Sequence, residues 1–136
     1  MPAETRPGYT VVGTTDETTQ CDCCGRTNLK MTVVLRDPDN EFVFYGRNCA
    51  ARATGWRAAH LDRQVYTAQA ATDRARATLA HYQQFLGTAG VDLFIARNPH
   101  IYTHRTSWGE IENMIAETIA EATAVLAPLN RTPTGA

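Results

Sequence analysis

The sequence has no run of apolar residues long enough to cross a membrane. Its apolar stretches all fall short of the ~18 residues that a membrane span needs. The first residues, Met1–Thr10, also lack the charged start and apolar stretch of a signal peptide. We therefore expect a cytoplasmic protein, in which clustered cysteines are better suited to binding metal than to forming disulfides.

The sequence also lacks short motifs that identify an enzyme. There is no G-x-S-x-G, no phosphate-binding P-loop, no dinucleotide fingerprint and no H-E-x-x-H. The acidic residues are scattered, and no nucleophile stands out beside a base. Because catalytic groups can also assemble from distant positions, this leaves an enzyme open, but a binding function is the better prediction.

The sequence also lacks a large net charge. The formal charge of −1 gives no overall attraction to nucleic acid or to a membrane surface. The charges are nevertheless unevenly distributed, with six cations against four acids from Cys21 to Arg57 and four glutamates in the last predicted helix. Two solvated faces would account for this asymmetry without any ligand.

All four cysteines lie in one stretch, Cys21–Gly55, around which the chain is organised. It begins with a C-x-x-C-G, a chain reversal that can aim two thiolates at one point. We call Cys21–Gly25 the knuckle. Gly25 suits the left-handed conformation that closes such a turn.

A β-hairpin is predicted directly after the knuckle. Two runs with β-propensity, Lys30–Arg36 and Glu41–Tyr45, flank the turn residues Asp-Pro-Asp-Asn at positions 37–40. The preceding stretch, Tyr9–Thr15, is suited to a third strand that pairs with the hairpin.

A short helix, Cys49–Thr54, is predicted to follow, with Asn48 as its N-cap and Gly55 as its end. A cysteine in the first turn of a helix should favour its thiolate, since the free N–H groups and the helix dipole stabilise negative charge. A knuckle, a hairpin and a helix that carries another cysteine follow in the order of a treble-clef zinc site.

These residues predict a Zn²⁺ site with Cys21, Cys24 and Cys49 as ligands. A closed structural site needs a fourth ligand. Either Cys23, next to a ligand already used, or His60, just after the glycine break, is a candidate. Buried or free thiols without metal are the alternative interpretation.

The same stretch resembles a group of small treble-clef-like zinc-binding proteins of bacteriophages and actinobacteria. The resemblance covers residues 21–55 and rests on C-x-x-C-G-R followed by an aromatic-Gly-x-x-Cys-Ala. It implies a zinc-stabilised fold and no single activity. The matching residues are Cys21, Cys24, Gly25, Arg26, Tyr45, Gly46, Cys49 and Ala50.

The rest of the chain predicts two long helices. From Trp56 to Leu86 there is no proline or glycine, and Gly87 is suited to end the helix. The second helix should begin at the capping box S-x-x-E of residues 107–110. Apolar and small residues at alternating four- and three-residue steps form a seam on the first helix that should meet the second in an antiparallel pair. That seam is Leu61, Val65, Ala68, Thr72, Ala75, Leu79, Tyr82 and Leu86.

The predicted fold is therefore α+β, with a small treble-clef-like hairpin zinc module followed by a long antiparallel helical pair. Residues 1–8 should be a flexible arm, 9–55 the zinc module, 56–129 the helical hairpin with a loop at 87–106, and 130–136 a disordered tail. Within the loop, Val91–Ala96 is apolar and suited to a short helix or strand.

Two functions fit this arrangement, both non-enzymatic. The first is a regulatory or adaptor protein that binds a protein partner, which includes a homodimer through the long helix. The second is a zinc module that contacts the phosphates of nucleic acid. Neutrality and the acidic last helix favour the first. The contact residues predicted around the knuckle are Arg26, Lys30, Arg47, Arg52 and Arg57.

Overall fold

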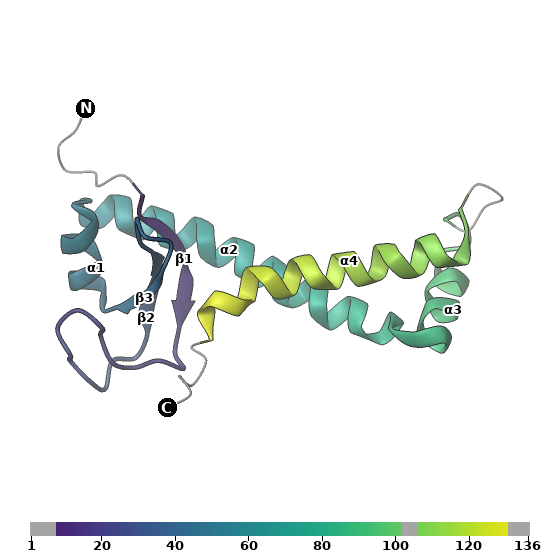
Figure 1. Ribbon diagram of the computed structural model, residues 1–136, viewed down its shortest axis with the longest axis horizontal. Coiled ribbons are helices and arrows are strands. Elements are labelled where there is room, and N and C mark those ends of the chain that lie inside the picture. The colour runs from purple at the N-terminus through teal and green to yellow at the C-terminus, as the bar shows by residue number, and fades with distance from the viewer. Residues whose placement is uncertain (1–7, 102–105, 131–136) are drawn as a thin grey trace. The chain divides into compact units, whose positions relative to one another are not determined.

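A computed structural model describes residues 8–101 and 106–130 of the chain (Figure 1). The predicted arm at residues 1–7, the end of the predicted loop at 102–105 and the predicted tail at 131–136 lie outside this description. The chain forms two compact units. The first comprises Met1–Thr72 and Leu126–Ala136, and the second comprises Asp73–Val125.

The first unit contains an antiparallel sheet of three strands in the order β1-β2-β3, which are Thr10–Thr15, Thr32–Arg36 and Phe42–Tyr45. The hairpin of β2 and β3 and its pairing with β1 confirm the prediction. The Asp37 carboxylate holds the turn between β2 and β3 by accepting hydrogen bonds from the backbone N–H groups of Asp39 and Glu41, each at 2.9 Å. A side chain that replaces backbone partners in this way is typical of an Asx turn.

Both faces of this sheet are covered, because alternate β2 residues point to opposite sides. On one face, Val33 and Leu35 are buried with residues of two helices, α1 (Arg47–Thr54) and α2 (Ala58–Tyr82). On the other face, Val34 is buried with Phe44 and with Leu129 of the short 3-10 helix η2 (Ala127–Leu129). The sheet therefore forms the core of the first unit.

The second unit consists of helices only. The end of α2 continues into the 3-10 helix η1 (Gln83–Phe85), and α3 (Gly87–Arg97) and α4 (Trp108–Leu126) follow. Within this unit the end of α2 and α4 run in opposite directions (Figure 1). The core cluster combines residues of three elements, which are Phe85, Val91, Phe94, Ile111 and Ile115.

The α+β class predicted from the sequence is thus confirmed, whereas details of the helical part need correction. Within the predicted loop, 87–106, the apolar run Val91–Ala96 is helix and not strand, because it belongs to α3, which buries Val91 and Phe94. The first helix ends at Tyr82 instead of Leu86, which is 54% exposed and lies outside the seam. The division into units falls within α2, after Thr72, instead of at Gly55.

The start of α4 agrees with the capping-box prediction. The backbone N–H of Glu110 donates a hydrogen bond to Ser107 Oγ at 3.1 Å, which satisfies a donor of the first turn. Among the described residues, no helix is both long and apolar enough to cross a membrane.

We predict that Gly90→Ala destabilises the second unit. A Cβ atom at Gly90 in α3 would lie 2.3 Å from the backbone carbonyl carbon of Phe85, so the η1–α3 connection would have to shift. Overpacking of this kind costs about 1–3 kcal/mol in free energy of unfolding. Gly109→Ala in α4 is the control, because the nearest atom to its Cβ is Ser107 Oγ at 4.0 Å.

Thermal or urea unfolding measures both variants. Gly109→Ala should be neutral or slightly stabilising, since alanine is preferred to glycine in a helix. A Gly90→Ala protein as stable as the wild type would show that α3 does not pack against η1 as described.

Candidate metal centre

The knuckle is a tight chain reversal closed by backbone hydrogen bonds. The N–H of Gly25 donates to the carbonyl of Cys21 at 2.8 Å, and the N–H of Cys21 donates to the carbonyl of Arg26 at 2.9 Å. Gly25 has φ of 78°, the left-handed conformation predicted from the sequence. The reversal brings Cys21 and Cys24 to the same side of the chain.

The third cysteine comes from α1, which follows β3 directly. Gly46, and not Asn48, is the N-cap of this helix, and no side chain caps it. Asn48 lies inside the first turn, because the helix already begins at Arg47. The end of the helix agrees with the prediction, since Gly55 is left-handed with φ of 76°.

The sulfur atoms of Cys21, Cys24 and Cys49 all lie within 4.8 Å of one another. We call these three residues the cysteine cluster. Cys21 and Cys49 are buried and Cys24 is exposed, and none of the three forms a disulfide. Three thiol groups at this spacing can hold a metal ion.

The backbone around Cys21 stabilises a thiolate. The Gly46 N–H donates a hydrogen bond to Cys21 Sγ at 3.2 Å. Burial raises the pKa of the Cys21 thiol, but hydrogen bonds from the backbone of Cys24, Gly46 and Cys23 outweigh it and lower the pKa to about 7. A sulfur that ionises near neutral pH is suited to be the first ligand of a metal ion.

The environment of Cys49 has the opposite effect. Burial raises the pKa of the Cys49 thiol to about 12, with further contributions from the thiols of Cys24, Cys21 and Cys23. The expectation that the helix start favours the Cys49 thiolate is therefore wrong for the cluster without a metal. Burial and the neighbouring sulfurs outweigh the helix dipole, because several sulfurs this close cannot all ionise without a cation between them.

Cys23 and His60 were predicted as possible fourth ligands. Among the described residues, neither has its ligand atom close to all three sulfurs of the cysteine cluster. The Cys23 side chain is exposed. The ring of His60 instead packs edge-to-face against Trp56, with 4.9 Å between the ring centroids. The Cys23 thiol does contribute to the raised pKa of Cys49.

A pocket of about 340 Å³ adjoins the cysteine cluster. We call it the cationic pocket, because four of the five predicted contact residues line it, namely Arg26, Lys30, Arg47 and Arg52. Arg57 does not belong to its described lining. The lining also includes the three cluster cysteines and two apolar residues, Leu29 and Met31, which no sequence pattern had indicated.

One of the four cations is already paired. Arg47 donates two hydrogen bonds to the Asp62 carboxylate of α2, at 2.9 and 2.7 Å, and these lower the pKa of Asp62. Arg52 instead lies near the cluster, with a guanidinium nitrogen 4.0 Å from Cys49 Sγ. Sequence spacing offered no signal for the Arg47–Asp62 pair, because the two residues meet only once α1 and α2 are folded.

We predict that Cys49→Ser loses bound metal and lowers the melting temperature, whereas Cys23→Ser retains both. Cys49 is buried and is the only cluster residue from α1, so its loss leaves the two knuckle sulfurs alone. Metal analysis and thermal unfolding of the two purified variants test this. Equal loss of metal in both would show that Cys23 is also a ligand.

No protein-family model, no curated protein and no solved structure matches the chain. The resemblance to small zinc-binding proteins of bacteriophages and actinobacteria therefore stays a prediction from residues 21–55.

Proposed function

We propose that this protein is a non-enzymatic binding module of treble-clef type whose first unit is stabilised by one Zn²⁺ ion on Cys21, Cys24 and Cys49. The observation that carries the proposal is the approach of three sulfurs to within 4.8 Å. In a tetrahedral site with Zn–S bonds of about 2.3 Å, two sulfurs lie about 3.8 Å apart. Small side-chain movements therefore suffice to bind the ion.

The kind of ligand favours zinc among the common metals. Thiolates select soft or borderline ions such as Zn²⁺, whereas Mg²⁺ and Ca²⁺ prefer oxygen ligands. Once bound, the ion neutralises part of the charge on the sulfurs, so that the thiols with a raised pKa can also ionise. The cytoplasm, the location expected from the sequence, would keep these thiols reduced.

Three protein ligands leave the fourth position of a tetrahedral ion to a water molecule or to a group from outside the cluster. All three cysteines line the cationic pocket, so a group bound in this pocket would lie beside the ion. Within the described lining of that pocket there is no histidine or carboxylate to act as a general base. We therefore assign the ion a structural role and not a catalytic one.

The charge of the cationic pocket is relevant to which kind of partner the protein binds. Overall neutrality favoured a protein partner, with a homodimer through α2 as one form of it, and these remain predictions. The gathering of four cations around one pocket is a specific observation in support of the second candidate, an anionic partner such as nucleic acid. Local charge supports this candidate, because a ligand in a pocket interacts mainly with the groups that line it.

Metal analysis tests the zinc proposal. Protein purified without chelators should contain about one zinc per chain, and a strong chelator should lower the melting temperature, since the ion ties the knuckle to α1. Protein that contains no metal, and whose four thiols all react freely in the folded state, would contradict the proposal.

A further inference from the structure

The cationic pocket has the size and chemistry of a small ligand site. Its volume of about 340 Å³ lies at the lower end of the range for ligand pockets, which is roughly 300–1,000 Å³. Cations occupy part of its lining, and the apolar side chains of Leu29 and Met31 occupy another part. Met31 is 55% exposed, so its apolar side chain is accessible to a ligand in the pocket.

We propose that this pocket binds one nucleotide of a single-stranded nucleic acid, with the phosphate against Arg26, Lys30 and Arg52 and the base against Leu29 and Met31. The proposal deepens the proposed function and rests on it, because the zinc-binding cysteines form part of the pocket lining.

The acids nearest in sequence hydrogen-bond to the backbone of the sheet and of its turn. The Asp22 carboxylate accepts a hydrogen bond from the Phe44 N–H at 2.9 Å, and the Asp37 carboxylate holds the β2–β3 turn, at the opposite end of β3 from α1. Within the described chain, no carboxylate lies within 4.0 Å of the charged atoms of Arg26 or Lys30. Three thiolates and a divalent metal ion together carry one net negative charge. The positive charge of the cations that line the pocket exceeds it.

The first turn of α1 adds to the positive potential. No side chain caps this helix, and its first residues, Arg47 and Asn48, line the pocket together with Gly46. Unpaired N–H groups at a helix start favour a phosphate group. The α1 helix thus supports the cations that carry the proposal.

A single strand fits this pocket better than a duplex or an acidic peptide. In a duplex the bases are stacked away from the phosphates, whereas a flexible strand can turn a base into a pocket beside its own phosphate. An acidic peptide would use the cations but would leave the apolar surface of Met31 without a matching group. Single-stranded nucleic acid matches both parts of the lining, because its phosphate can contact the cations and its base can contact the apolar side chains.

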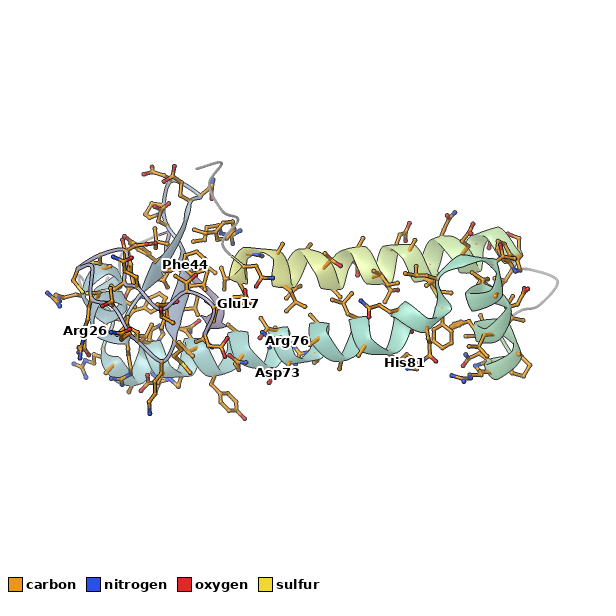
Figure 2. The ribbon with its side chains drawn as sticks, turned by 90° about the horizontal axis from the view of Figure 1, so that it is seen from below. Glu17, Arg26, Phe44, Asp73, Arg76 and His81 are labelled. Atoms are coloured by element: carbon orange, nitrogen blue, oxygen red, sulfur yellow. The ribbon has the colours of Figure 1, made fainter. Side chains whose placement is uncertain are left out.

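The Arg47–Asp62 pair lowers the positive charge available to a ligand. Both side chains are more than half exposed, with relative accessibilities of 55% and 53%. Removing the carboxylate would release Arg47, which already lines the pocket, to contact the phosphate. A second exposed pair, Arg76 with Asp73 at 3.3 Å, belongs to the second unit and provides a matched control (Figure 2).

The test measures binding of a fluorescent single-stranded oligonucleotide to the zinc-loaded protein by anisotropy, at several salt concentrations. Arg26→Ala with Arg52→Ala should weaken binding about tenfold or more, since each charged hydrogen bond contributes substantially. The slope of log affinity against log salt should fall by about 0.7 for each phosphate that the variant no longer neutralises. Arg57→Ala, outside the described pocket lining, should change little.

Variants at the two ion pairs distinguish binding in the pocket from attraction by the overall charge of the protein. Asp62→Asn should strengthen binding about two- to fivefold, the range expected for breaking an exposed pair that competes with the ligand. Asp73→Asn removes the same charge in the second unit and should leave the affinity unchanged. Equal strengthening by both variants would mean that overall charge governs binding, and would overturn the pocket.

Three further outcomes would also overturn the inference. Zinc-loaded wild-type protein that binds no oligonucleotide at low salt would remove the nucleic-acid ligand and leave the zinc proposal intact. Undiminished binding in the Arg26 and Arg52 double variant would place the site elsewhere. Polyglutamate that binds as tightly as the oligonucleotide, with the same weakening in the double variant, would assign the pocket to an acidic protein segment.

Discussion

The meeting of three cysteine sulfurs from two distant parts of the chain is the constraint on which the proposed function depends. Residues 16–31, which include the knuckle, form neither helix nor strand. Individual hydrogen bonds attach this stretch to the sheet, such as that from the Thr32 hydroxyl to the Thr18 carbonyl at 3.0 Å. A metal ion that joins Cys21 and Cys24 to Cys49 would fix the stretch against α1, because ligand bonds restrict segments that the apolar core does not reach.

The groups that form the metal centre also form the pocket beside it. The Gly46 N–H stabilises the Cys21 thiolate, and the same residue begins the helix that brings Cys49 and Arg47 into position. A change that disturbs the cluster would therefore also disturb the pocket lining. In the proposed function the ion has no chemical step to perform, and its contribution is to hold the cations in place for a ligand.

Much of this arrangement could be predicted from the sequence because local chemistry determines it. Turn residues identified the hairpin, C-x-x-C-G identified the knuckle, and Ser107 identified the start of α4.

The predictions that failed did so for physical reasons. Asn48 is not the N-cap, because the helix already starts at Arg47, with Gly46 as its N-cap. The helix α3 lies within the predicted loop, and Gly90 is needed there because the Phe85 backbone leaves no room for a side chain. Pairings between distant residues, such as Arg47 with Asp62, leave no sequence pattern.

The number of sulfurs around the bound ion tests the central claim most directly. X-ray absorption of the zinc-loaded protein reports the type and distance of the ligand atoms without depending on stability or binding. Three protein sulfurs at about 2.3 Å, with one lighter atom completing the shell, is the result expected. A shell of nitrogen and oxygen atoms without sulfur would contradict the claim that the cysteine cluster holds the metal.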